Sequence, residues 1–153
     1  MEPILLAYIG IGVLTGMSFI GSAYGVTISG NAVVGAMKKN PDSLGLYIAL
    51  SALPSSQGLY GFVAYFLLQK HLVDSIPMIS GCAILGAGLM MGFAAFFSAV
   101  RQAQVCANGI AGIGAGHNVF VATMVMAVFP ELYAILALLV VILVGGSLPL
   151  AVV

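Results

Sequence analysis

One apolar stretch with a single acid in it decides the fold: Met126-Ala127-Val128-Phe129-Pro130-Glu131-Leu132-Tyr133-Ala134-Ile135-Leu136. Glu131 is the only charged residue in the longer run from Val119 to Leu143. A helix crosses the hydrocarbon layer with about 20 apolar residues, so the run predicts a membrane helix with a carboxylate at mid-depth. A carboxylate there costs several kcal/mol. A proton or a metal cation must therefore neutralise Glu131, which makes it a candidate functional site.

The composition of the whole chain agrees with a membrane protein. Of its 153 residues, 62% are hydrophobic and 5% are charged, and the formal net charge is zero. A soluble domain of this size cannot hide so much apolar surface, so the bilayer is the expected solvent. Zero net charge argues against nucleic acid as a partner. The sequence predicts an all-α membrane protein.

Polar turns divide the chain into four expected crossings. Pro41 ends the first crossing because proline cannot continue a helix, and similar polar segments separate the others. Lys38 and Lys39 are the densest basic pair, which places the first and third turns in the cytoplasm and both termini outside. The prediction is a first helical hairpin over 1–76, with helices at 4–36 and 44–69, and a second over 77–153, with helices at 78–111 and 119–148.

The two hairpins are related by an internal repeat. Shifting the chain so that Pro54 falls on Pro130 also superposes Ser22-Ala23 on Ser98-Ala99, and three glycines of the first helix on three of the third. The position equivalent to Glu131 is Ser55, so only the second hairpin carries the acid. Glycine is concentrated in the first and third helices, which predicts a closely packed inner layer flanked by the bulkier second and fourth helices. A closed ring of copies needs such a taper.

Two prolines are expected to free backbone carbonyls near the acid. Pro54 and Pro130 lack a backbone N–H, so the carbonyls of Leu50 and Met126 lose their usual helical partners. Carbonyls exposed at membrane depth persist where they line a cavity or are buried in protein. The sequence therefore predicts loosened backbone oxygens beside the site.

If the second, third and fourth helices meet, the acid gains a set of oxygen ligands. These are the Glu131 carboxylate, the amides of Gln57 and Gln102, the Ser56 hydroxyl and a loosened carbonyl. Hard cations prefer oxygen, and a single carboxylate without clustered Cys or His argues against Ca²⁺ or Zn²⁺. A monovalent cation such as Na⁺ fits the charge. Tyr60 is one turn beyond Gln57 and is expected to donate its hydroxyl to Glu131.

With these residues the chain resembles the proteolipid rotor subunit of V-type and A-type ATPases, especially the four-helix bacterial K subunit. The resemblance covers nearly the whole chain and rests on the blocks 53–62, 98–102 and 131–136. It implies that Na⁺ is held by the Leu53 carbonyl and by four side chains, those of Ser56, Gln57, Gln102 and Glu131. Tyr60 matches the tyrosine that hydrogen-bonds the acid. Ser56 departs mildly from the threonine that is frequent in the family.

The resemblance also implies an assembly. Identical copies would form a ring that rotates past a stationary membrane subunit with an Arg, surrounded by lipid and joined by central-stalk subunits to a separate ATP-hydrolysing sector. The chain has no phosphate-binding motif, so it is not expected to be an enzyme, and no organic cofactor is expected. The implied location is a bacterial inner membrane.

Alternative functions remain open from the residues. A lone buried carboxyl can bind H⁺ without an oxygen cage, so a proton-carrying rotor is the nearest alternative. A small four-helix drug/proton antiporter also uses one membrane Glu, although aromatic drugs favour Trp in the pocket and this chain has none. A passive pore leaves Glu131 unexplained. Arg101 is the main departure from the family pattern, and it is expected to extend toward the surface or face another subunit.

Overall fold

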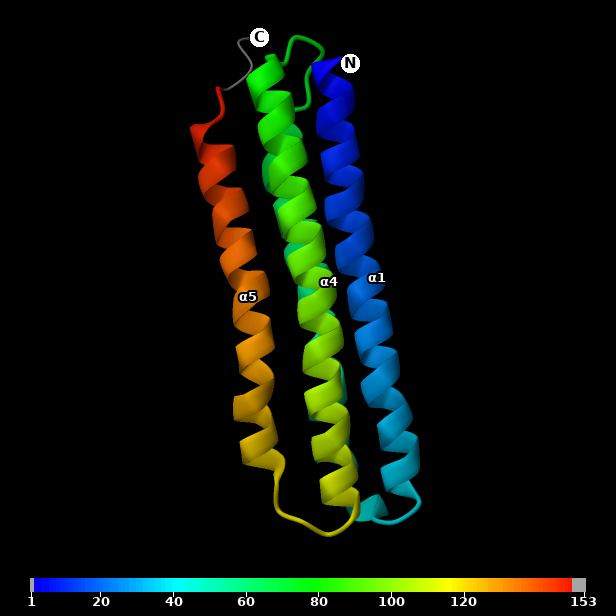
Figure 1. Cartoon of the computed structure of the whole chain (residues 1–153). Helices are drawn as coiled ribbons and strands as arrows, with labels where there is room; N and C mark the ends of the chain where they lie inside the picture. The colour runs from blue at the N-terminus through cyan, green and yellow to red at the C-terminus, as the bar shows by residue number, and fades with distance from the viewer. Residues whose placement is uncertain (1, 150–153) are drawn as a thin grey trace.

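The chain folds as a long bundle of helices joined by short turns, in a computed structural model that describes residues 2–149. Figure 1 shows α4 between α1 and α5, with α1 beginning at the end of the bundle where α5 finishes. This confirms the predicted all-α class. The helices are α1 (Pro3–Met37), α2 (Leu44–Ala52), α3 (Ser56–Leu68), α4 (Met78–Gly114) and α5 (Phe120–Ser147), with 3₁₀ turns η1 (Pro41–Ser43), η2 (Leu53–Ser55) and η3 (Gln69–His71).

The second pass is not the single helix over 44–69 that the sequence predicted. It consists of α2 and α3 joined by η2, a 3₁₀ turn around Pro54. The Leu53 carbonyl accepts both the backbone N–H of Ser56 and its hydroxyl, the latter at 3.0 Å. The 3₁₀ turn thus places the Leu53 carbonyl and the Ser56 side chain together at mid-depth.

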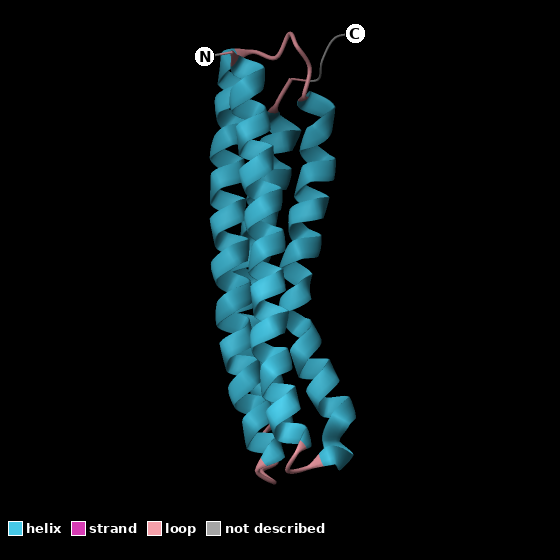
Figure 2. Ribbon diagram, turned by 90° about the vertical axis from the view of Figure 1, so that its right-hand side faces the viewer, coloured by secondary structure: helices cyan, strands magenta, loops and turns pink. Residues whose placement is uncertain are grey.

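The other mid-depth proline leaves its helix unbroken. α5 continues through Pro130 as one α-helix, and Figure 2 shows the helices side by side along the bundle with the loops at its two ends. Proline removes one backbone hydrogen bond, and polar side chains of a neighbouring helix can satisfy the carbonyls nearby. The carbonyls that accept such bonds are those of Ser51 and Ala127, each one residue after the predicted Leu50 and Met126.

α1 and α4 pack closely against each other in the bundle. A β-carbon added at Gly10 would lie 2.6 Å from the Ile84 carbonyl oxygen, and one at Gly92 would lie 2.8 Å from that of Val13. A β-carbon at Gly88 would overlap the Gly10 carbonyl. These contacts are backbone against backbone, which only small residues permit.

The helices are long and apolar enough for a membrane. Among residues 2–149, three unbroken helices meet the length and hydropathy of a span: α1 with 35 residues, α4 with 37 and α5 with 28. The fourth pass, α2–η2–α3, runs alongside them, but the 3₁₀ turn divides it into shorter helices. The helices of the bundle are thus expected to cross the hydrocarbon layer, and Glu131 lies near the middle of α5.

We predict that Gly88→Ala destabilises the chain by about 1–3 kcal/mol, because the added methyl overpacks the contact with the Gly10 carbonyl. Gly146→Ala is the matched control, since a β-carbon there meets nothing within 4 Å. The measurement is loss of helical circular dichroism during titration with a denaturing detergent. Equal stability of the two variants would contradict the close α1–α4 contact.

Candidate ion-binding site

Glu131 lies half-buried on α5 and accepts hydrogen bonds from three side chains on two other helices. The hydroxyls of Ser56 and Tyr60, both on α3, donate to Oε1 at 2.7 Å. Nε2 of Gln102, on α4, donates to Oε2 at 2.9 Å. Hydrogen bonds to a charged acceptor are short and strong, so these donors fix the carboxylate between the helices.

Three oxygen atoms surround the hydroxyl oxygen of Ser56. Its Oγ lies 2.7 Å from Oε1 of Glu131, 3.0 Å from the Leu53 carbonyl oxygen and 3.3 Å from Oε1 of Gln57. These distances bring a carboxylate, a hydroxyl, an amide and a backbone carbonyl into one small volume. Oxygens of these kinds are ligands for hard cations, and the single negative charge matches one monovalent ion.

A buried network of hydrogen-bonded amides lies next to these oxygens. Gln57 and Gln102 are fully buried, and Nε2 of Gln57 donates to Oε1 of Gln102 at 2.8 Å. The same nitrogen donates to the Ser98 hydroxyl at 3.1 Å, and Ser98 donates to the Pro130 carbonyl at 2.8 Å. Because buried polar groups are costly without partners, this network holds the amides in fixed orientations.

Ser98 is a site residue that the sequence patterns did not assign. Two signals pointed to it: it precedes Gln102 by one helical turn, and its repeat equivalent is also a serine, Ser22. Ser22 accepts a hydrogen bond from the backbone N–H of Gly58 at 2.7 Å. Both serines thus satisfy polar groups next to a proline-interrupted segment.

The two amides are oriented as a coupled pair. Gln102 presents Nε2 to Glu131 and to the Ala127 carbonyl, and presents Oε1 to Gln57. For its oxygen to face the carboxylate instead, its amide must turn over. Gln57 must then turn too, because two N–H groups cannot face each other without an acceptor.

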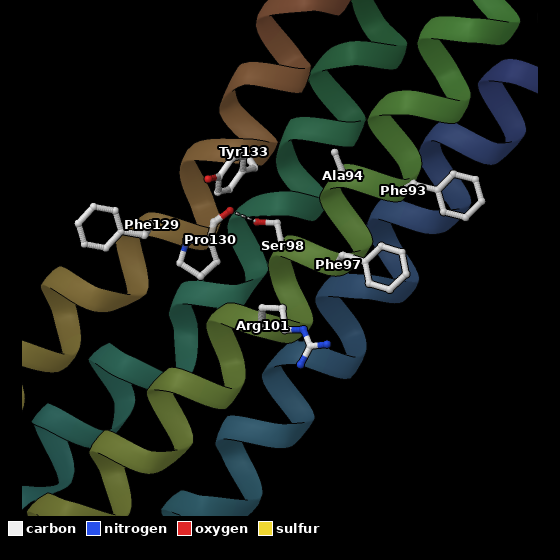
Figure 3. A pocket seen from close by; sticks show the side chains of 8 residues that line it. All are labelled: Phe93, Ala94, Phe97, Ser98, Arg101, Phe129, Pro130 and Tyr133. Atoms are coloured by element: carbon white, nitrogen blue, oxygen red, sulfur yellow. Dashed lines mark hydrogen bonds between the residues drawn. The ribbon is translucent and has the colours of Figure 1, made fainter.

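Arg101 does not join this set of side chains. It lies on α4 in a separate groove of about 510 Å³ between α4 and α5 (Figure 3), and its Nη1 donates to Oε1 of Gln104 at 3.1 Å. Gln102, the next residue, points into the bundle because successive helical residues are about 100° apart. Arg101 is therefore exposed at the surface of the chain. The three side chains that donate to Glu131 are neutral.

We predict that Tyr60→Phe weakens cation binding at this site about tenfold, because a hydrogen bond to a charged group contributes about 1.5–3 kcal/mol. The lost hydroxyl is the one that fixes Oε1 of Glu131. Tyr133→Phe is the control, because Tyr133 is 69% exposed and lines the groove between α4 and α5 that Arg101 also lines. Binding measured by isothermal titration on the purified protein should change only for Tyr60→Phe.

Two stretches of the chain match one known protein family. Residues 9–68 and 85–144 each match the family described as the C subunit of ATP synthase, at the same offset that superposes Pro54 on Pro130, which confirms the duplicated hairpin. The chain is also similar to the A-type ATP synthase subunit K of Methanocaldococcus jannaschii, 33% identical over 94% of this chain and 63% of that protein. It therefore spans somewhat less than two thirds of that relative's length.

Other relatives differ in the ion that their names give. The V-type sodium ATPase subunit K of Enterococcus hirae is 34% identical over 86% of this chain and 85% of its own length. A V-type proton ATPase subunit of Saccharomyces cerevisiae is 21% identical over 95% of this chain and 72% of that protein. The names of these relatives include both ions, so the identity of the ion depends on the chemistry of the site.

Proposed function

The chain belongs to the family of ATP synthase C subunits, as a rotor proteolipid of the V/A type, and from this premise we propose that it carries Na⁺ at Glu131. The observation that carries the proposal is the group of four oxygens formed by the Ser56 hydroxyl and its three neighbours, one of them from the single acid. As a proteolipid it is a non-catalytic, ion-translocating subunit, and ATP hydrolysis or synthesis belongs to another part of the complex. Membership in this family leaves the drug/proton antiporter without support.

The proposed ligands are the carbonyl of Leu53, Oγ of Ser56, Oε1 of Gln57 and the carboxylate of Glu131. Gln102 is the fifth proposed ligand, and it supplies Oε1 only when it and Gln57 turn over together. That turn carries Oε1 of Gln57 away from Ser56, so the two amide oxygens serve as alternative ligands. Until that turn, Gln102 holds the carboxylate through its N–H at 2.9 Å. Tyr60 positions Oε1, and Pro54 and Pro130 shape the backbone on either side.

Charge neutrality links ion binding to rotation. A carboxylate at membrane depth costs several kcal/mol when it faces lipid, whereas a carboxylate paired with Na⁺ is neutral. A loaded site can therefore turn through lipid, and an empty site is held back until it meets a compensating charge. We propose an Arg of the stationary membrane subunit as that charge, and central-stalk subunits as the path of the torque.

The proposed setting is a ring of identical copies in a bacterial inner membrane. Lys38 and Lys39, in the turn after α1, favour the cytoplasmic side for this end of the bundle. Both termini then face outward. The repeat supports one ion per chain, because Ser55 occupies the position equivalent to Glu131.

A proton is the second candidate ion, because a lone buried carboxyl can bind H⁺ without an oxygen cage and because a more distant relative is named as a proton ATPase subunit. Binding of radioactive ²²Na⁺ to the purified ring separates the two. We expect saturable binding of one Na⁺ per chain that H⁺ and Li⁺ reduce competitively. Absence of Na⁺ binding at neutral and alkaline pH, in a ring that still reacts with carbodiimide, would assign the site to H⁺.

A further inference from the structure

The break in the second pass leaves polar backbone groups that need partners. α2 ends at Ala52 and α3 begins at Ser56, with the 3₁₀ turn η2 between them. The last carbonyls of a helix and its first N–H groups have no partner within that helix. Pro54 adds to this deficit, because in a 3₁₀ turn the N–H that it lacks is the one that would pair with the Ser51 carbonyl. At membrane depth no water replaces such bonds, so neighbouring residues must supply them.

Two serines of α1 supply these partners. The Ser22 hydroxyl accepts a hydrogen bond from the backbone N–H of Gly58, the third residue of α3, at 2.7 Å. The Ser29 hydroxyl donates to the Ser51 carbonyl, near the end of α2, at 3.1 Å. Ser29 is fully buried and also reaches carbonyls one turn earlier in its own helix, the nearest at 3.1 Å. α1 therefore caps both helix ends at the break, one on each side of η2.

The spacing of the two serines fits this contact. Ser22 and Ser29 are about two helical turns apart, so they lie on the same face of α1. Gly25 lies between them, and a β-carbon added there would lie 2.6 Å from Cβ of Pro54. Because Gly25 has no side chain, α1 comes close enough for both serines to reach the second pass. We call Ser22, Gly25 and Ser29 together the α1 cap.

The second hairpin meets the same need with a residue of the ion site. At the repeat offset, the Ser51 carbonyl corresponds to the Ala127 carbonyl. The Ala127 carbonyl accepts a hydrogen bond from Nε2 of Gln102 at 3.0 Å, and the same nitrogen donates to Glu131. In each hairpin, a side chain of the preceding long helix therefore caps the carbonyl at this position. The two caps differ in that Gln102 touches the acid directly, whereas Ser29 touches only the backbone.

The segment between the two capped ends carries proposed ligands of the cation. The Leu53 carbonyl oxygen and Oγ of Ser56 lie 3.0 Å apart in this short stretch. Oγ of Ser56 also lies 2.7 Å from Oε1 of Glu131. A small displacement of η2 would therefore change the distances among these oxygens, although it would leave the side chains of α4 and α5 in place.

We propose that Ser22 and Ser29 are positioning residues for cation binding, which fix the turn that presents the Leu53 carbonyl and the Ser56 hydroxyl. The inference rests on the Na⁺ site of the proposed function, and it gives a role in that site to α1, which carries none of the proposed ligands. A cation needs its oxygens held in place by surrounding groups, whereas a proton needs only the carboxyl group. Loss of the α1 cap therefore weakens Na⁺ binding much more than it weakens proton binding.

Replacement of the two serines in the purified ring tests this role. We would compare Ser22→Ala and Ser29→Ala with Thr27→Ala, which removes an exposed α1 hydroxyl that bonds to Ala23 of its own helix. The affinity for ²²Na⁺ should fall about three- to tenfold in each serine variant, as expected for the loss of one hydrogen bond. The proton affinity of Glu131, measured from the pH dependence of carbodiimide labelling, should change much less. Ser22→Thr keeps the hydroxyl and should bind Na⁺ like the parent.

Amide hydrogen exchange adds a readout that does not depend on the ion. Peptides that cover residues 50–60 should exchange about three- to tenfold faster in both serine variants than in Thr27→Ala, because a backbone group at the break loses its partner. Unchanged Na⁺ affinity, an equal loss of Na⁺ and proton affinity, or a loss in Ser22→Thr as large as in Ser22→Ala overturns the positioning role. Faster exchange in a ring that binds no Na⁺ refutes the sodium carrier and retains the α1 cap, whereas unchanged exchange in a ring that binds Na⁺ does the reverse.

Discussion

Replacement of Glu131 by Gln is expected to abolish ion transport by the assembled complex. Gln has almost the same shape but no charge, so the cation loses its only counter-charge. Removing one partner of a buried charge pair costs about 3–5 kcal/mol. Because 1.4 kcal/mol is about a tenfold change, Na⁺ affinity should fall at least about a hundredfold. The measurement is ATP-driven ²²Na⁺ uptake by inverted membrane vesicles.

Glu131→Asp is the matched variant, because it keeps the charge but draws it back from Ser56 and Tyr60. We expect weakened, measurable uptake from Glu131→Asp and none from Glu131→Gln. Both variants should fold normally, since neither alters the α1–α4 contact within the chain. Normal Na⁺ uptake by Glu131→Gln would show that the ion travels by another route.

Gln57→Leu is expected to have the second-largest effect, and a selective one. The substitution removes an oxygen ligand and leaves Oε1 of Gln102 and the Ser98 hydroxyl without their donor. A buried polar group left unpaired costs about 1–3 kcal/mol, so Na⁺ affinity should fall about a hundredfold. The proton affinity of Glu131 should change much less, because its three donors remain. Na⁺ and H⁺ titrations of the purified ring measure the two effects separately.

Gln104→Leu provides the comparison for this variant. Gln104 is an exposed glutamine that bonds to Arg101 and does not touch the oxygens around Ser56. Its replacement should leave Na⁺ affinity within about twofold of the parent, as surface substitutions usually change little. A similar loss in both variants would mean that Gln57 acts through general packing.

The sequence predicts the gross fold because the bilayer imposes simple rules. Apolar runs of sufficient length must be helices, and the offset between Pro54 and Pro130 relates the two hairpins before any coordinates are known. Close approach of α1 and α4 follows from their glycines. These features depend on composition and spacing, which the chain displays directly.

The local backbone geometry at the two prolines is harder to predict from the sequence than the gross fold is. Pro54 and Pro130 occupy equivalent positions, yet the first lies in a 3₁₀ turn and the second inside an α-helix. Their hydrogen-bond partners differ as well: the Ser56 hydroxyl donates to the Leu53 carbonyl on its own segment, whereas the Ser98 hydroxyl donates to the Pro130 carbonyl from another helix. Only the packed structure reveals such long-range partners.

The sequence predicted which side chains come together, but not how they are hydrogen-bonded to one another. Glu131, Ser56, Gln57, Gln102 and Tyr60 all meet, as their positions on three passes indicated. The amide orientations and the role of Ser98 were not predicted, because several arrangements satisfy the same donors and acceptors. For Arg101 the sequence left two placements, and the structure puts it in the groove between α4 and α5, apart from the side chains that bond to Glu131.

The most direct test of the central claim is carbodiimide labelling of Glu131 in the purified ring, followed by mass spectrometry. Carbodiimides modify a protonated carboxyl group, so a cation held by the carboxylate prevents the reaction. At a fixed pH, Na⁺ should slow labelling of Glu131 in a saturable manner, and K⁺ at the same ionic strength should not. Labelling that responds to pH but is unchanged by Na⁺ would contradict a sodium site at Glu131.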